Sequence, residues 1–163
     1  MVYWFTGLSG AGKTTIGRLW LEELKKRGES PIFLDGDELR FVFGSDLGYS
    51  EQDRHKSAMR NARICEMLSK QGFTVICCTI SMFDSVRDYN REHIPEYREI
   101  YVKVSYDVLK KRDQKGLYTS ADSDVAGVHF NVEEPKSPDI TLENNGETTP
   151  NKQIDILREK FLR

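Results

Sequence analysis

The chain has 163 residues, of which 38% are hydrophobic and 31% are charged, as is typical of one globular domain with a single core. Its formal net charge of −2 argues against a general nucleic-acid coat, so no nucleic-acid partner is expected and any anionic ligand needs a local site. The longest apolar stretch, Phe73–Ile80, is too short to cross a membrane, and cysteines without metal-ligand spacing favour a reducing compartment, so we expect a cytoplasmic protein with no membrane partner.

The chain opens on a strand-like run, Val2–Thr6, with no charged-then-apolar leader before it. Apolar residues then recur at helical spacing over Ile16–Leu24, and a second strand-like run follows at Pro31–Leu34. Strand, helix and strand in this order are typical of a crossover unit with parallel strands.

A second helical pattern covers Ala58–Leu68. Ser50 with Asp53 resembles a capping box that opens this helix, and Gly72 is suited to end it. The buried-type run Phe73–Thr79 follows and predicts a third strand. In this strand Cys77 and Cys78 would point to opposite faces of the sheet and are poorly placed to pair.

Two further strands are predicted at Glu99–Val104 and Asp139–Leu142, and an amphipathic helix at Asn151–Leu162 closes the chain. Strands that alternate with helices of this length indicate a three-layer α/β/α fold around a mostly parallel, five-stranded sheet. No linker divides residues 1–163, so a single domain is expected, with mobile loops at Asp113–Lys136 and Glu143–Pro150.

The segment GLSGAGKTT, Gly7 to Thr15, matches the phosphate-binding pattern G-x-x-x-x-G-K-[ST] between a strand and a helix. Glycines let the backbone turn its N–H groups inward, and the helix N-terminus adds partial positive charge. We therefore expect a nucleoside-triphosphate site in which Lys13 reaches the β- and γ-phosphates and the Thr14 hydroxyl holds Mg²⁺. The residues predicted to bind the triphosphate here are Gly7, Ser9, Gly10, Ala11, Gly12, Lys13, Thr14 and Thr15. The alternative is a glycine-rich turn with an incidental lysine.

LDGDELR follows the second strand and places Asp35 and Asp37 at a strand's carboxyl end, where ligands bind in open α/β sheets. Two carboxylates beside a phosphate site can orient Mg²⁺ with its waters and accept a hydroxyl proton. The alternative is a plain turn, because Asp-Gly is common turn chemistry. Lys13, Asp35 and Asp37 are thus the candidate catalytic residues.

Six segments, GLSGAGKTT, LDGDELR, DLGYSEQDR, ISMF…RDYNRE, KRDQKGLY and PKSPDI, resemble those of adenylylsulfate (APS) kinases in order and spacing. The resemblance covers nearly the whole chain. It implies a P-loop kinase with a mobile lid at about residues 113–136, which uses ATP and Mg²⁺ to phosphorylate a ribose 3′-hydroxyl. Since such kinases are often dimers, it also implies a possible homodimer.

The resemblance assigns roles to individual residues. It implies that Asp37 is the base or orienting group for the hydroxyl, that Asp35 supports Mg²⁺ through water, and that Arg112 covers the ATP adenine. The acceptor-binding residues that it implies, besides Asp37, are Arg40, Tyr49, Arg54, Ile80, Ser81 and Lys115. The non-functional alternatives are core packing for Tyr49 and a solvated surface charge for Arg54. A surface position is favoured for Arg87, Arg91 and His129, although a ligand role stays open for Arg87 and Arg91.

Two departures from the family pattern concern the acceptor. The predicted lid is shorter and acidic, and it carries Ser123 and Val125 where the family has lysine and phenylalanine. The family's I-S-P-F-R becomes Ile80–Asp84, so a proline and an arginine are missing. Fewer cations near the acceptor would weaken the grip on a sulfate group.

Three acceptors follow from this pattern. The favoured one is a non-APS nucleotide such as cytidine diphosphoramidate, from a capsule or surface-polysaccharide pathway, whose neutral amide needs less cationic support. The second is APS itself, and the third is an unrelated small hydroxyl compound. A different class, a non-catalytic nucleotide-binding module, is disfavoured because Lys13 and Asp37 are both present.

Overall fold

A computed structural model of the chain describes residues 1–112 and 132–162. Its strands are β1 Val2–Thr6, β2 Ile32–Asp35, β3 Val75–Cys78, β4 Tyr97–Lys103 and β5 Ile140–Glu143. Its helices are α1 Lys13–Lys26, α2 Gly36–Val42, α3 Glu51–Lys70, α4 Asp84–His93, α5 Tyr106–Arg112 and α6 Pro150–Phe161. The ends of every predicted strand lie within two residues of those observed.

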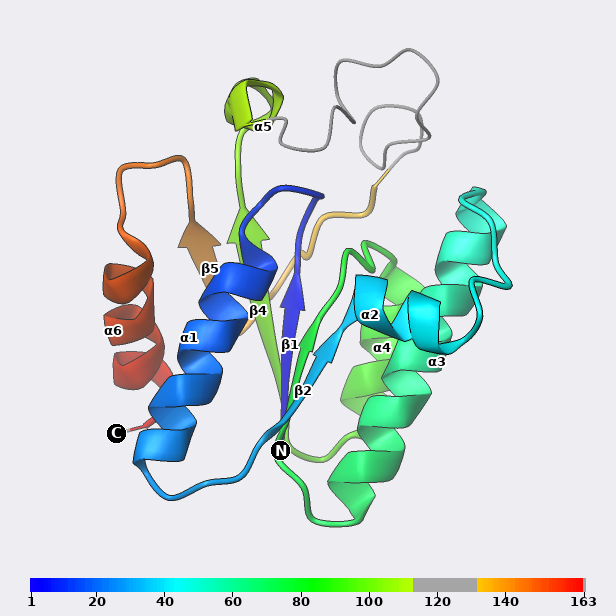
Figure 1. Ribbon diagram of the computed structural model, residues 1–163, viewed down its shortest axis with the longest axis horizontal. Coiled ribbons are helices and arrows are strands. Elements are labelled where there is room, and N and C mark those ends of the chain that lie inside the picture. The colour runs from blue at the N-terminus through cyan, green and yellow to red at the C-terminus, as the bar shows by residue number, and fades with distance from the viewer. Residues whose placement is uncertain (113–131, 163) are drawn as a thin grey trace.

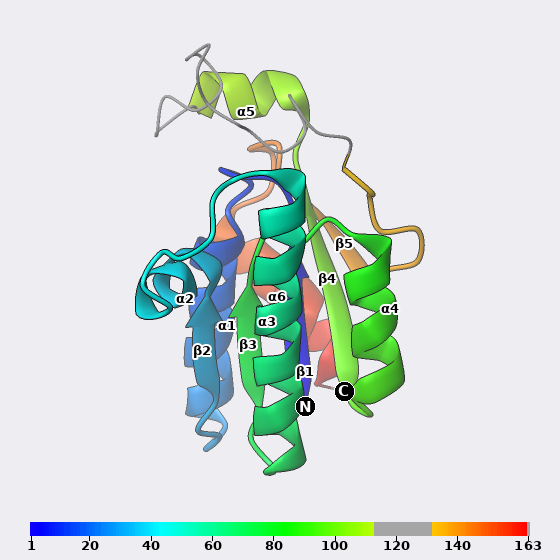
Figure 2. The same ribbon diagram turned by 90° about the vertical axis from the view of Figure 1, so that its right-hand side faces the viewer.

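The five strands form one parallel sheet in the order β2-β3-β1-β4-β5. Helices α1 and α6 pack on one face, and α3 and α4 pack on the other (Figure 1 and Figure 2). The carboxyl ends of all five strands therefore point to the same edge, above which α5 lies in Figure 1. The predicted three-layer, parallel α/β fold is confirmed.

Alternating side chains of the strands build two separate cores. From β1, Tyr3 and Phe5 pack toward α1 and α6, whereas Val2 and Trp4 pack toward α3 and α4. Cys78 lies in the first of these cores and Cys77 in the second. Both of them and Cys65 are buried free thiols. Because Cys77 and Cys78 are free and face opposite sides of the sheet, the prediction that they are poorly placed to pair is confirmed.

The ends of α3 follow the predicted local chemistry. The Ser50 hydroxyl accepts a hydrogen bond of 3.1 Å from the Asp53 N–H. At the other end Gly72 has a positive φ of 90°, and Phe73 N–H donates to Leu68 O at 3.2 Å. A left-handed residue closing such a bond is a common way to end a helix. The pattern analysis predicted neither α2 nor α5, and both helices have only seven residues.

The expected surface position of Arg87 is wrong. Its side chain is only 2% exposed, and its Nε lies 3.5 Å from a carboxylate oxygen of Glu99, which is fully buried on β4. Arg91, on the same helix face, also bonds to Glu99 but keeps 40% of its side chain exposed. A buried carboxylate needs positively charged partners. Arg87 and Arg91 on α4 supply them for Glu99 on β4.

No helix in residues 1–112 and 132–162 is long and apolar enough to cross a membrane.

We predict that Gly17→Ala destabilises the protein by about 1–3 kcal/mol, the usual cost of overpacking a core. A Cβ at this position would lie 2.4 Å from Cys78 Sγ and 3.2 Å from the Phe33 ring. The sign of the change in unfolding free energy tests for the contact, because the same substitution at an exposed helix position stabilises the protein by about 1 kcal/mol. Denaturant unfolding measures the change. The double variant Gly17→Ala/Cys78→Ala should recover part of the loss relative to the two single variants, and strict additivity would contradict the contact.

Candidate active site

The loop between β1 and α1 is shaped for a close approach of backbone to a ligand. Gly7 and Gly12 have φ values of 149° and 96°, in the region that favours glycine. A Cβ on Gly7 would lie 2.4 Å from Val102 O, and one on Gly12 would lie 2.6 Å from Asn144 Nδ2. Only glycine fits these two positions, and α1 then begins at Lys13 with its amino end facing the loop.

One carboxylate joins the loop to the next strand. The Thr14 hydroxyl donates to Asp35 Oδ2 at 2.7 Å, and the Asp37 N–H donates to Asp35 Oδ1 at 2.9 Å. Asp35 is therefore the N-cap of α2, and it holds Asp37 in that helix's first turn. Lys13 is 9% exposed, and its ammonium group donates to Leu8 O at 2.7 Å.

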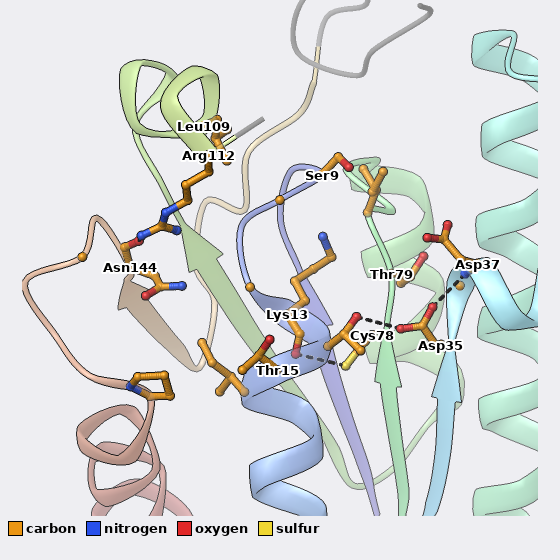
Figure 3. A pocket seen from close by; sticks show the side chains of 18 of the residues that line it. Ser9, Lys13, Thr15, Asp35, Asp37, Cys78, Thr79, Leu109, Arg112 and Asn144 are labelled. Atoms are coloured by element: carbon orange, nitrogen blue, oxygen red, sulfur yellow. Dashed lines mark hydrogen bonds between the residues drawn. The ribbon is translucent and has the colours of Figure 1, made fainter. Parts of the chain in front are cut away.

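These side chains line a cavity of about 690 Å³ at the carboxyl edge of the sheet (Figure 3). Lys13 points into it between Asp35 and Asp37 on one side and Arg112 and Asn144 on the other. The predicted site residues that line the cavity are Ser9, Gly10, Gly12, Lys13, Thr14, Thr15, Asp35, Asp37, Ile80 and Arg112. Gly7 and Ala11 belong to the loop but not to this lining, and Ala11 is fully buried beneath it.

The segment that follows β5 forms a wall of the cavity that the sequence analysis missed. Asn144 Nδ2 donates to Ala11 O at 2.7 Å, and Arg112 Nη2 donates to Asn144 O at 2.7 Å. Asn145 Oδ1 accepts from Ser105 N–H at 2.8 Å. The expectation of a mobile loop at Glu143–Pro150 stays a prediction, and these hydrogen bonds tie its residues Asn144 and Asn145 to the P-loop, to Arg112 and to Ser105 beyond β4.

Several lining residues beyond the predicted set come from this wall and from α5. They are Leu109, Asn144, Gly146, Thr148, Thr149 and Pro150. The Asn-Gly pair resembled an ordinary turn, so it carried no functional signal. The Thr-Pro pair is a recognisable helix start, and the Thr149 hydroxyl does cap α6. That signal could have placed α6 with its amino end at the cavity.

The predicted acceptor residues Arg40, Tyr49 and Arg54 gather beside α2 and α3, but they do not line the cavity. Tyr49 is 56% exposed, and the Arg40 and Arg54 guanidinium carbons lie 4.5 and 5.3 Å from its ring centroid. Arg40 Nη1 also donates to Leu47 O at 2.6 Å, and Arg54 Nε to Tyr49 O at 2.9 Å. The alternative of core packing for Tyr49 is wrong.

Ser81 stands in a strained turn next to Ile80. Its φ of 37° is left-handed, which costs a non-glycine residue about 1–2 kcal/mol. The side chain is 4% exposed, and its hydroxyl has no hydrogen-bond partner in the part of the chain that the structure describes. Lys115, Ser123, Val125 and His129, to which the sequence analysis gave roles or positions, lie outside the described residues.

Cys78 lies under the cavity. Burial raises the pKa of its thiol well above the ordinary value, and the S–H group donates to Lys13 O at 3.4 Å. The group is therefore a neutral donor that supports the first turn of α1, and it is not a nucleophile.

A parallel α/β sheet with a P-loop, a buried lysine and two carboxylates at its carboxyl edge defines a P-loop phosphotransferase. The adenylylsulphate kinase family model matches residues 1–143, and the chain belongs to that family. Its named relatives are kinases, and the chain is a phosphotransferase with an alcohol acceptor.

Three proteins illustrate how similar this chain is to its relatives in sequence and in structure. Cytidine diphosphoramidate kinase of Campylobacter jejuni subsp. jejuni serotype O:2 is 39% identical over 98% of this chain and 95% of its own length. Adenylyl-sulfate kinase of Halothermothrix orenii is 37% identical over 96% and 89%. The structure of Mycobacterium tuberculosis APS kinase CysC in complex with AMPPNP and APS has a TM-score of 0.90 and 28% identity, covering 99% of this chain and 97% of that one.

We predict that Asn144→Asp weakens ATP binding about 5- to 10-fold, the value of roughly one lost hydrogen bond. Aspartate keeps the shape of asparagine but cannot donate to Ala11 O, so the P-loop loses its tie to the β5–α6 wall. Isothermal titration with an ATP analogue measures the affinity. Asn145→Asp is the matched control, because Asn145 uses its side-chain oxygen to accept a bond and aspartate can do the same. Equal affinity of Asn144→Asp and the unaltered protein would contradict the role of this bond.

Proposed function

We propose that the chain transfers the γ-phosphoryl group of ATP to the 3′-hydroxyl of a nucleotide's ribose. The observation that carries the proposal is the convergence of Lys13, Thr14, Asp35 and Asp37 on one cavity, in a chain of the adenylylsulphate kinase family. The structural relative in complex with AMPPNP supports ATP as the donor.

The donor side supplies positive charge without covalent chemistry. The N–H groups of the loop, the amino end of α1 and the Lys13 ammonium would surround the β- and γ-phosphates. Lys13 donates to a carbonyl of its own loop, which holds its side chain over the loop. Arg112 and Asn144, on the opposite side from Asp37, would flank the adenosine part of the nucleotide.

The residues around Thr14 fit Mg²⁺. A hydroxyl and a carboxylate oxygen 2.7 Å apart are hard oxygen ligands, and a kinase site needs only one or two of them beside phosphate oxygens and water. Thr14 would bind the ion directly and Asp35 through water. When bound, the ion would neutralise charge on the phosphates.

Asp37 is the group placed to receive the acceptor hydroxyl. The capping bond from its own N–H to Asp35 fixes its backbone, and its side chain faces the cavity near Thr79. A carboxylate here would orient the hydroxyl and take its proton as the phosphoryl group arrives. Arg40 and Arg54 would bind the acceptor's 5′-phosphates, with Tyr49 stacked near its base and Lys115 close to the transferred group.

For the acceptor we propose a cytidine diphosphoramidate-like nucleotide. The similarity to cytidine diphosphoramidate kinase, which spans nearly both chains, supports this choice. The surroundings of Asp84 support it as well. Its Oδ2 pairs with Lys136 Nζ at 2.7 Å and its Oδ1 with Arg87, so each of these cations already has a carboxylate partner. An acceptor whose tail ends in a neutral amide has the smaller need for cations at this edge.

APS is the second candidate acceptor. Its support is the 37% identity to the adenylyl-sulfate kinase of Halothermothrix orenii and the fold shared with a structure that contains APS.

We predict that cytidine diphosphoramidate is phosphorylated with a kcat/KM at least about tenfold above that for APS, equivalent to about 1.4 kcal/mol. An assay that couples ADP release to NADH oxidation, run with both acceptors at saturating ATP and Mg²⁺, measures the ratio. Efficient turnover of APS at micromolar concentration would contradict the preference and leave the kinase assignment intact.

We predict that Asp37→Ala lowers kcat about 10²- to 10⁴-fold, the range that general-base catalysis contributes, with ATP affinity close to that of the unaltered protein. The matched control is Glu38→Ala, one residue further along α2, which removes an exposed carboxylate paired with Arg18. A wild-type rate for Asp37→Ala, or an equal loss in both variants, would contradict the role of Asp37.

A further inference from the structure

The turn at Ile80–Asp84 is held from outside by the segment that begins at residue 132. Glu133 N–H donates to Met82 O at 3.1 Å, and Asp84 N–H donates to Glu133 Oε2 at 2.6 Å. One residue, Glu133, thus holds the turn through both its backbone and its carboxylate. In Figure 2 this segment runs beside α4 toward β5.

The turn needs such support. Ser81 is not a glycine, yet its backbone is in the left-handed conformation. A strained residue keeps such a conformation only where contacts with its surroundings hold it. From the other side, the Thr6 hydroxyl donates to Ile80 O at 2.5 Å. Thr6 and Glu133 therefore hold the two ends of a turn that the local sequence alone would not favour. Ile80, at its start, lines the cavity.

Glu133 is itself held by a buried cation. Arg87 Nη2 donates to Glu133 O at 2.7 Å and also bonds to Asp84, while Arg87 Nε faces Glu99. Arg87 is 2% exposed, so this guanidinium belongs to the rigid core of the molecule. Lys136 adds an exposed ion pair to Asp84 at 2.7 Å. Glu99 on β4 thus positions Arg87, and Arg87 in turn positions Glu133 against the turn.

We propose that Glu133 is a positioning residue for the acceptor side of the site. It keeps the Ile80–Asp84 turn in its strained conformation, and so places Ile80 and Ser81 for the acceptor nucleotide without touching ATP. The inference rests on the proposed function in one respect, namely that the acceptor binds beside Ile80.

The test uses two variants of Glu133 and one of its neighbour Glu134. Glu133→Ala removes the acceptor of the Asp84 N–H bond, whereas Glu133→Gln keeps a side-chain carbonyl in its place. Glu134→Ala is the matched control, because Glu134 is the same residue type in the same segment but pairs with Lys103 at 3.5 Å. Both positions are exposed, so folding should be preserved, and thermal unfolding verifies it.

Steady-state kinetics with the acceptor that is turned over best should show that Glu133→Ala raises the acceptor KM about 5- to 10-fold, as expected for the loss of one hydrogen bond. Its ATP KM should stay unchanged, and Glu133→Gln and Glu134→Ala should resemble the unaltered protein. An equal rise of both KM values, or a rise with Glu134→Ala as well, would overturn the proposal.

Hydrogen exchange separates this inference from the proposed function. In Glu133→Ala the Asp84 amide should exchange at least about tenfold faster, because its acceptor is gone. Failure of the unaltered protein to phosphorylate any nucleotide would contradict the proposed function, but unchanged exchange at Asp84 would overturn the role of Glu133 whatever the acceptor is. Faster exchange without a change in the acceptor KM would overturn the positioning role alone.

Discussion

The carboxylate of Asp35 is the constraint on which the site depends. Its two oxygens accept hydrogen bonds from the Thr14 hydroxyl at 2.7 Å and from the Asp37 N–H at 2.9 Å. It therefore fixes the distance between the phosphate-binding loop and the helix that carries the candidate base. Asp35 is only 9% exposed, and a poorly hydrated carboxylate holds such donors more strongly than a surface group would. These two hydrogen bonds therefore tie the first turn of α1 to the first turn of α2.

The order of the strands explains why these parts meet. In the order β2-β3-β1-β4-β5, the carboxyl ends of β1, β2 and β3 lie together and present the P-loop, Asp35 and Thr79 to one space. β5 ends at the same edge on the other side of β1, and Asn144 reaches from there to Ala11. The parallel sheet thus brings segments that are far apart in the sequence to the lining of one cavity of about 690 Å³.

The sequence predicted those features that local chemistry determines. The P-loop and its glycines, the cap at Ser50 and the five strands follow from residue types at short spacing. The contact between the β5–α6 wall and the P-loop could not be predicted, since Asn144 donates to a carbonyl 133 positions away in the chain. The burial of Arg87 was missed for a related reason. Helical periodicity shows that Arg87 and Arg91 share a face, but only the sheet shows that this face meets Glu99.

The buried pair of Arg87 and Glu99 is better understood as a positioning device than as a source of stability. Burial raises the pKa of the Glu99 carboxyl, while the nearby Arg91 and Arg87 oppose that change. Two apolar side chains of equal volume would often stabilise a core as well as such a pair does. They could not, however, donate a hydrogen bond to Glu133 O or bind Asp84. The cost of removing these charges from water is offset by a fixed position, because the guanidinium that faces the fully buried Glu99 also bonds to Asp84 in the strained turn and to Glu133 beside it. Glu99 on β4 thus determines, through Arg87, where a turn lies whose first residue, Ile80, lines the cavity.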